Sequence, residues 1–153
     1  MKRNLTITLA ALMLASLLAG CDEPTSYSAE SITATVVDAD TRKPLEGVIV
    51  VAHWQLVSGN AGGTFQVGQL MVQEAATDKE GRFHFPAWGP KRRIQGYLIN
   101  WDPRLLIFKR GYEYQMLTND FKGEGMWKAP VRKSKWNNRT ISLKRFKGSL
   151  EDY

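Results

Sequence analysis

The chain has little of the chemistry on which most enzymes and metalloproteins depend. Among its 153 residues there is one cysteine, Cys21, and there are two histidines, His53 and His84. A single cysteine excludes an internal disulfide, a redox-active cysteine pair and a cysteine metal cluster. No third metal ligand stands at a suitable spacing from the histidines, and no Gly-x-Ser-x-Gly nucleophile motif occurs. We therefore predict that the chain is not an enzyme and has no catalytic residue, no metal and no cofactor.

The sequence also lacks an apolar run long enough to span a membrane. The longest run extends from Leu5 to Gly20 and is interrupted by three hydroxyl residues. It falls short of the roughly 20 apolar residues that a spanning helix needs. It follows a short cationic start, Lys2-Arg3, and ends in small residues, which is the layout of a secretory signal. Residues 1–20 are therefore predicted to be a cleaved signal peptide, with an uncleaved membrane anchor as the alternative.

The end of this segment carries a motif. Leu18-Ala19-Gly20-Cys21 resembles the lipobox of bacterial lipoproteins, which are cut before the cysteine and lipidated on it. The resemblance implies a diacylglyceryl group on the Cys21 sulfur and usually an acyl chain on the new amino terminus. Each buried methylene contributes about 0.8 kcal/mol, so two or three chains would anchor the protein stably. The resemblance thus implies a membrane partner, held through the N-terminal lipid on the periplasmic side.

The residues after Cys21 bear on which membrane this is. Asp22-Glu23 resembles the signal that keeps enterobacterial lipoproteins at the inner membrane, although both acids also suit a solvated linker. We therefore expect a lipid-anchored protein at the inner rather than the outer membrane. Residues 21–31 are polar and contain Pro24, which predicts a lipidated tether. The ten residues 22–31 reach at most about 35 Å, so the domain must act close to the bilayer.

From Ile32 onward the sequence shows strands and turns. Residues 32–37 alternate in polarity, residues 47–51 form a β-branched run, and residues 82–85 place Phe83 and Phe85 on one face. In residues 65–72 the apolar face switches near Gly68, which predicts a bulge. Other strands are expected at 94–99, 105–108, 112–117 and 140–143. About seven strands without helical periodicity predict an all-β, antiparallel β-sandwich over residues 32–147, followed by a tail at 148–153.

Two turns of this region carry a family resemblance. The carboxypeptidase regulatory-like, or transthyretin-like, domain is resembled by Val36-Val37-Asp38-Ala39-Asp40-Thr41-Arg42-Lys43-Pro44-Leu45-Glu46-Gly47-Val48 and by Thr77-Asp78-Lys79-Glu80-Gly81-Arg82-Phe83. The resemblance implies a tight hairpin at Asp78–Gly81 and an interaction or accessory module without catalytic residues of its own. One transthyretin-like branch consists of hydrolases ending in Tyr-Arg-Gly-Ser. Here Phe146-Lys147-Gly148-Ser149 matches only loosely, so a small hydrolase of this type is a third alternative.

Charge is distributed unevenly along the chain. Residues 22–90 contain four basic and nine acidic side chains, whereas residues 91–147 contain fifteen basic and four acidic ones. The second part is therefore expected to offer a basic surface to phospholipid headgroups or to an acidic protein partner in the periplasm or inner membrane. Nucleic acid is excluded by the exported location, and solvated loop charges are the alternative. The candidate contacts with an anionic surface are Lys133, Lys135 and Arg139.

Tryptophans suggest a second kind of partner. Trp127 and Trp136 lie in a long loop from Thr118 to Arg139, where exposed indoles could stack on sugar rings. Covering the ends of the sandwich is the other role that loop tryptophans fill. We therefore predict a non-enzymatic, membrane-anchored interaction or accessory module, with a glycan- or peptidoglycan-binding module as the main alternative.

Overall fold

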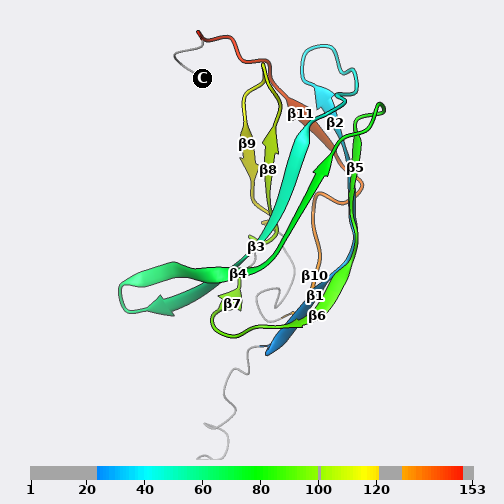
Figure 1. Ribbon diagram of the computed structural model, residues 1–153. Coiled ribbons are helices and arrows are strands. Elements are labelled where there is room, and N and C mark those ends of the chain that lie inside the picture. Colours follow the sequence, from blue (N-terminus) through cyan, green and yellow to red (C-terminus); the bar gives the residue numbers. More distant parts are fainter. Residues whose placement is uncertain (1–23, 100, 121–128, 150–153) are drawn as a thin grey trace, which may run out of the picture.

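The computed structural model describes residues 24–99, 101–120 and 129–149, and this part of the chain is all-β (Figure 1). Its two layers of mostly antiparallel strands confirm the predicted β-sandwich, with more strands than the seven expected. The strands are β1 (Ser26–Ala29), β2 (Ile32–Asp38), β3 (Ile49–Asn60), β4 (Gly63–Ala76), β5 (Arg82–Phe85), β6 (Trp88–Arg92), β7 (Tyr97–Leu98), β8 (Arg104–Phe108), β9 (Gln115–Leu117), β10 (Val131–Arg132) and β11 (Thr140–Leu143).

Two short sheets make up one layer and a single larger sheet makes up the other. The first layer contains the strand orders β10-β1-β6 and β11-β2-β5, and the second contains β4-β3-β8-β9 with β7 also paired to β3. The pairs β1–β10 and β2–β11 are parallel, while the other strand pairs are antiparallel. Each parallel pair joins a strand from the start of the described chain to one near its end, and this separation allows the long crossover connection that parallel strands require.

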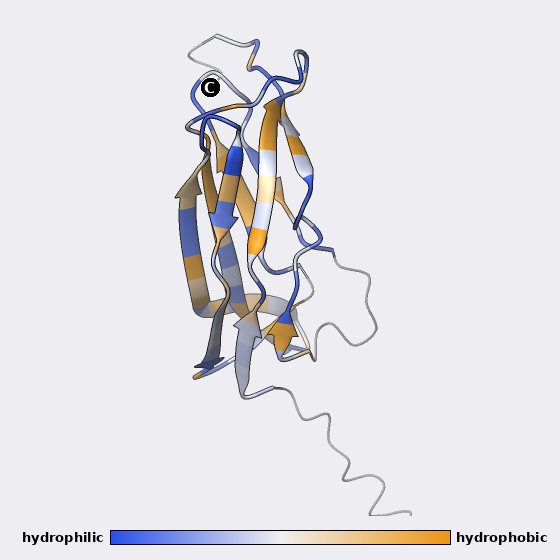
Figure 2. Cartoon of the chain, turned by 90° about the vertical axis from the view of Figure 1, so that its right-hand side faces the viewer, coloured by the Kyte–Doolittle hydropathy of each residue, from blue (hydrophilic) through white to orange (hydrophobic). Residues whose placement is uncertain are grey.

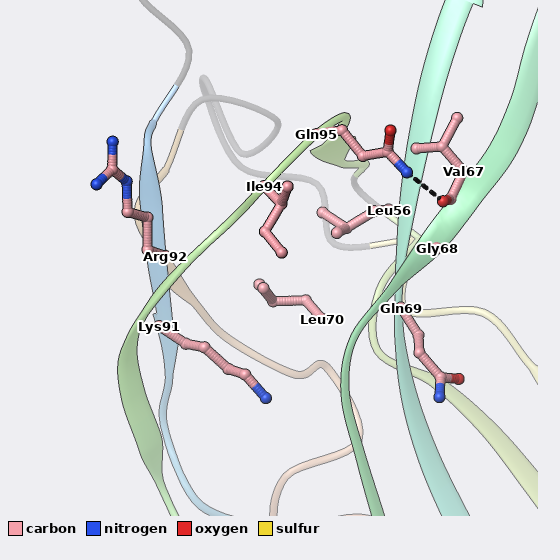
Figure 3. A pocket seen from close by; sticks show the side chains of 9 residues that line it. All are labelled: Leu56, Val67, Gly68, Gln69, Leu70, Lys91, Arg92, Ile94 and Gln95. Carbon is pink, nitrogen blue, oxygen red and sulfur yellow. Dashed lines mark hydrogen bonds between the residues drawn. The ribbon is translucent and has the colours of Figure 1, made fainter.

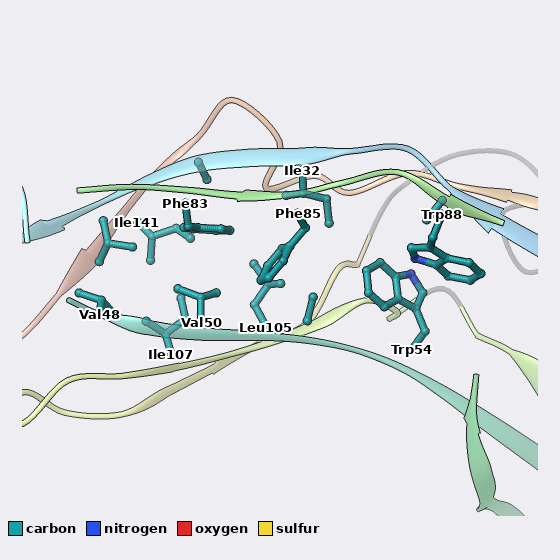
Figure 4. Packing of buried hydrophobic residues seen from close by; sticks show 14 of the residues in the cluster. Ile32, Val48, Val50, Trp54, Phe83, Phe85, Trp88, Leu105, Ile107 and Ile141 are labelled. Carbon is teal, nitrogen blue, oxygen red and sulfur yellow. The ribbon is translucent and has the colours of Figure 1, made fainter. Parts of the chain in front are cut away.

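The core lies between the layers and follows the alternation of the strands. In β3, Val50, Ala52 and Trp54 are at most 1% exposed, and they face Phe83 and Phe85, at 2% and 1%, from β5 (Figure 4). Successive side chains on a strand point to opposite faces, so every second residue is buried. The resulting alternation of hydrophobic and hydrophilic bands is visible along the strands (Figure 2). The predicted inward direction of both phenylalanines is confirmed.

Strands β3 and β4 form a long hairpin whose end projects from the body of the sandwich (Figure 1). Its register shifts twice, between Trp54 and Gln55 and between Leu56 and Val57. At the second shift Leu56 pairs with Gly68, whereas Val57 pairs with Gln66. One extra residue on β4 changes whether its odd-numbered or its even-numbered side chains face the core. The bulge predicted near Gly68 is therefore confirmed.

The predicted tight turn at Asp78–Gly81 is present, but the strands on either side of it do not pair with each other as a hairpin would. Strand β5 pairs with β2 rather than with β4, so the turn carries the chain from one layer to the other. The Gly81 N–H donates to the Asp78 carbonyl at 2.9 Å, and Gly81 has φ +73°. A Cβ there would lie 2.5 Å from the Val36 carbonyl oxygen, so only glycine fits.

The folded domain begins before the predicted boundary at Ile32. Ser26–Ala29 is strand β1, and Tyr27 is 1% exposed in the core. Part of the expected tether is therefore a paired strand, which four residues of alternation were too short to reveal. Between Cys21 and β1 only residues 22–25 remain, which brings β1 within about 17 Å of Cys21 along the chain.

Candidate interaction surfaces

The three predicted anion contacts lie on one loop that follows β10, but they differ in their surroundings. The Lys133 ammonium lies 3.2 Å from a Glu30 carboxylate oxygen. Lys135 is half-buried, with its ammonium 5.1 Å from the centre of the Trp136 ring. Arg139 is exposed. Two of the three cations are therefore engaged by neighbours within the domain, which reduces what the loop offers to an external anion.

Of the two predicted glycan contacts, Trp136 lies in the described chain, and its indole is engaged within the domain. Trp127 lies outside the described residues, as do Cys21 and the sorting residues Asp22 and Glu23. Trp136 is half-buried against the core, and its Nε1 donates to the Thr118 carbonyl at 3.1 Å. This hydrogen bond and the contact with Lys135 hold the indole in place, where it supports the loop.

Two further tryptophans lie in the core. Trp88, which the sequence placed in a turn-rich segment, is 8% exposed. It packs edge to face against Trp54, with the ring centroids 5.2 Å apart (Figure 4). By contrast, the side chain of Trp101 is 52% exposed. Buried area, rather than sugar stacking, accounts for the positions of Trp54 and Trp88.

The two histidines do not adjoin. His53 is on β3 and His84 is on β5, and these strands belong to different layers. The Nδ1 of His84 lies 2.8 Å from Thr33 Oγ1, and burial lowers the pKa of His53. Within the described ranges, no three potential metal-ligating side chains gather.

The outer face of the larger sheet carries a surface that the sequence analysis missed. Register places Phe108 opposite Ile49 and places Leu106 between Val51 and Met116. These five side chains form a contiguous cluster, which we call the outer apolar patch. Ile49, Phe108, Leu106 and Met116 are 37%, 43%, 44% and 63% exposed. The signal was the run Leu105-Leu106-Ile107-Phe108, which is apolar at both parities, so that one apolar pair faces the core and the other faces solvent.

A groove of about 250 Å³ lies at the end of the sandwich where the described chain begins (Figure 3). Leu56 and Leu70, each 5% exposed, provide an apolar lining. Lys91 and Arg92 from the end of β6 contribute cations, and Ile94 follows on the adjoining loop. Gln95 closes one side by donating from Nε2 to the Val67 carbonyl at 2.8 Å. The groove therefore combines an apolar lining with positive charge.

A buried polar cluster supports the loops near this end. Asn119, which is fully buried, donates from Nδ2 to the Asp102 carbonyl at 2.9 Å and to the Lys133 carbonyl at 2.7 Å. Burial raises the pKa of Asp102 to about 6, although the Arg104 and Arg132 guanidinium groups lower it in part. The cluster joins loops that are far apart in sequence and has a structural role.

The opposite end, which we call the distal end, is organised around Asp38. Its carboxylate accepts the backbone N–H groups of Thr41 and Asp40 at 2.9 and 3.0 Å and the Tyr112 hydroxyl at 2.9 Å. Arg145 lies 2.9 Å from the same carboxylate. These contacts, with the Thr41 N–H first, hold the pKa of Asp38 well below its usual range. Acidic and basic segments thus neutralise each other here.

Comparisons with known proteins identify no family. No protein-family model matches the chain, and no curated protein matches it. Matching solved structures include a 3-chlorocatechol 1,2-dioxygenase from Rhodococcus opacus 1CP, with 17% identity, a TM-score of 0.46, and coverage of 82% of this chain and 62% of that one. The dioxygenase domain of a carbohydrate-binding fusion from Streptomyces sp. SirexAA-E has 17% identity, a TM-score of 0.40, and coverage of 83% and 84%. A 9R-lipoxygenase from Cyanothece PCC8801 has 15% identity, a TM-score of 0.33, and coverage of 82% and 18%.

These matches correct one prediction. The sequence predicted that the chain is not an enzyme, yet two of the matched structures are named as dioxygenases, and one of those matches falls within a dioxygenase domain. The absence of enzymatic activity is therefore withdrawn. At these identities and TM-scores the matches carry no argument for a reaction, a substrate or a metal in this chain. The resemblance to carboxypeptidase regulatory-like domains stays a prediction.

Helices play no part in the described chain. None of the described residues belongs to a helix of the length and apolar character that crossing a membrane requires.

Proposed function

We propose that the protein is a lipoprotein anchored through Cys21 at the periplasmic face of the inner membrane, and that it is an interaction module which binds a protein partner through the outer apolar patch. The observation that carries this proposal is the patch itself. Its residues come from β3, β8 and β9 and are neighbours by strand register, so they form one surface rather than scattered exposed side chains. Contiguous apolar surface of this kind is typical of interaction sites.

The chemistry of the patch favours a protein over a glycan. Leucine, isoleucine, valine, phenylalanine and methionine side chains have no strong hydrogen-bonding group to offer the hydroxyls of a sugar. A protein surface of similar character would cover them and remove apolar area from water at roughly 25 cal/mol per Å². Aromatic and methionine side chains, here Phe108 and Met116, are enriched at such interfaces.

The short connection to the anchor restricts where the partner lies. Only residues 22–25 separate Cys21 from β1, so the sandwich stays next to the bilayer. The outer apolar patch is on the larger sheet, away from the layer that contains β1. A partner in the inner membrane, or a periplasmic protein near it, can therefore reach the patch while the anchor remains inserted.

Site-directed photocrosslinking in intact cells tests the partner surface. A photoreactive residue at Met116 is expected to give a discrete crosslinked protein, whereas one at His84, exposed on the opposite layer, gives none. Leu106→Asp is expected to abolish the Met116 crosslink without unfolding the domain, because Leu106 points away from the core. Equal crosslinking from both layers, or an unchanged Met116 product in the Leu106→Asp chain, contradicts the proposed surface.

The anchor has its own test. The mass of the amino-terminal peptide is expected to show Cys21 as a lipidated first residue, and Cys21→Ser should release the protein from membranes. Membrane density fractionation should place the unmutated chain with inner-membrane markers, and Asp22→Ser should move it outward. An unmodified Cys21 contradicts the anchor, and an outer-membrane position contradicts the sorting.

A further inference from the structure

We propose that Lys91–Gln95 is a membrane-docking tip, which seats the anchored end of the sandwich on anionic phospholipid by placing Ile94 among the lipid chains and Lys91 and Arg92 at the headgroups. This inference rests on the proposed lipid anchor and adds a second, non-covalent contact with the same bilayer.

The position of the tip follows from strand pairing. Strand β6 runs antiparallel to β1 and pairs Arg92 with Ser26. The Arg93 N–H donates to the Thr25 carbonyl at 3.0 Å, so the tip lies beside the first described residues. Cys21 precedes Pro24 by three residues, which limits the distance between their Cα atoms to about 11 Å. A lipid on Cys21 therefore brings the membrane surface to Lys91–Gln95.

The tip is held in place by its own backbone and by Arg93. The Arg93 guanidinium donates to the Pro24 carbonyl at 2.6 Å and to the Gly96 carbonyl, which ties the loop to the segment that leads to the anchor. Gly96 has φ +63°, and a Cβ there would lie 2.6 Å from the Val57 carbonyl oxygen, so the loop packs directly on β3. Arg93 is thus a positioning residue that fixes the direction of Ile94.

The side chains of the tip match the layers of a lipid surface. Ile94 is 100% exposed, and a fully exposed isoleucine has no partner in the domain. Lys91 and Arg92 are exposed, and no acidic side chain of the described chain pairs with them. An apolar residue directly after a run of cations can insert into the membrane interface while the cations bind anionic headgroups. The groove beside Ile94, lined by Leu56 and Leu70, adds apolar surface at the same level (Figure 3).

The comparison with the loop after β10 supports this choice of surface. Lys133 pairs with Glu30, and Lys135 lies over Trp136, so those charges are already engaged. Strand β10 pairs with Ser28 and Ala29, at the other end of β1 from Ser26. The cations on the tip are closer to Cys21 along β1, and they pair with no acidic side chain among the described residues. Lys91 and Arg92, rather than Lys133, Lys135 and Arg139, are therefore the anion contacts of the proposal.

The experiment uses the full-length lipidated chain in proteoliposomes. Cys21 is the only cysteine, so once it is lipidated the wild-type chain has no thiol, and Ile94→Cys introduces a single one. In vesicles containing phosphatidylglycerol, a membrane-impermeant maleimide is expected to label Ile94→Cys at least about tenfold more slowly than in detergent. Tyr114→Cys, a 71% exposed position at the distal end, should be labelled at similar rates in both.

The cations are tested in the same Ile94→Cys chain. Lys91→Gln with Arg92→Gln should remove most of the protection in phosphatidylglycerol vesicles, because two basic residues near an anionic surface together contribute about 2 kcal/mol, which is roughly a thirtyfold change. Lys144→Gln with Lys147→Gln, which removes the same charge at the distal end, should leave the protection unchanged. Neutral phosphatidylcholine vesicles should give the low protection of the Lys91 and Arg92 variant.

The outcomes separate failure of the tip from failure of the anchor. If the wild-type chain floats with vesicles and takes up no maleimide, the anchor is present. Equal labelling of Ile94→Cys in vesicles and in detergent then overturns the tip alone. If the wild-type chain is itself labelled and does not float, Cys21 is unmodified and the proposed function fails first. Protection that is the same for both double variants would contradict the electrostatic part of the proposal.

Discussion

The two ends of the sandwich both carry charged side chains, but they differ in whether those charges are paired within the fold. At the distal end, the Asp38 carboxylate is surrounded by backbone N–H groups, the Tyr112 hydroxyl and Arg145. At the end where the described chain begins, Lys91 and Arg92 are exposed next to a fully exposed Ile94. Charge that is paired within the fold stabilises it, whereas exposed unpaired charge remains available to an outside partner. The net charge of a segment therefore says less about binding than the location of its counter-ions does.

The first prediction concerns the core between the layers, whose loss would destabilise both ends of the sandwich. Phe83→Ala removes a ring that is 2% exposed between the layers, and the expected cost is about 3 to 5 kcal/mol of unfolding free energy. His84→Ala, on the exposed face of the same strand, should cost less than about 0.5 kcal/mol. Chemical denaturation measures both. A loss below about 1 kcal/mol for Phe83→Ala would show that the register of β5 is incorrect.

The second prediction contrasts the two buried carboxyls by pH. Burial raises the pKa of Asp102 to about 6 in the folded chain, from an ordinary value of 3.8. Between these two pKa values the folded state binds more protons than the unfolded state. The contribution of Asp102 to the free energy of unfolding therefore falls as pH rises from 4 to 6, by an amount on the order of 3 kcal/mol. Asp102→Asn should remove this fall, as measured by denaturation at several pH values.

Asp38 is the control of opposite sign. Its pKa is lowered in the folded chain, so the stability it contributes is present above its unfolded pKa and is lost as pH falls below that value. Asp38→Asn should therefore flatten the acid side of the stability profile. An Asp102→Asn chain that still loses stability between pH 4 and 6 as the wild type does would contradict the assignment to Asp102.

The third prediction weakens only the distal end. Tyr112→Phe removes the hydroxyl that donates to the Asp38 carboxylate at 2.9 Å, and a hydrogen bond to a charged group contributes about 1.5 to 3 kcal/mol. The unfolding free energy should fall by that amount, while the protection of Ile94→Cys in proteoliposomes should not change. Loss of protection in the Tyr112→Phe chain would mean that the two ends are coupled.

The smallest effect is expected from the loop after β10. Lys133→Gln breaks an exposed pair with Glu30, and exposed ion pairs contribute about 0 to 1 kcal/mol. Neither the midpoint of denaturation nor the protection of Ile94→Cys should change appreciably. A loss of protection equal to that of the Lys91 and Arg92 variant would return the anion contact to the loop that the sequence favoured.

The sequence was most informative where the signal is local. Alternation in residues 82–85 predicted which phenylalanines are buried, and the change of parity near Gly68 predicted the bulge, because side-chain direction depends only on position along a strand. Strand β1 was missed because four residues hold too little alternation. The outer apolar patch was missed because exposure of Leu106 and Met116 depends on what covers the sheet, which the strand itself does not encode.

The sequence alone determined the all-β class, the positions of the turns and the apolar face of each strand. These features follow from the order of neighbouring residues. The resemblance of Leu18-Ala19-Gly20-Cys21 to a lipobox likewise rests on the sequence alone. Only the tertiary structure decided that β5 pairs with β2 and that β10 and β11 run parallel to β1 and β2. It also decided which cations are neutralised. Arg145 meets Asp38 across 107 positions of the chain, whereas Lys91 and Arg92 pair with no acid in the part of the chain that the structure describes, because ion pairing depends on distances in space that the fold creates.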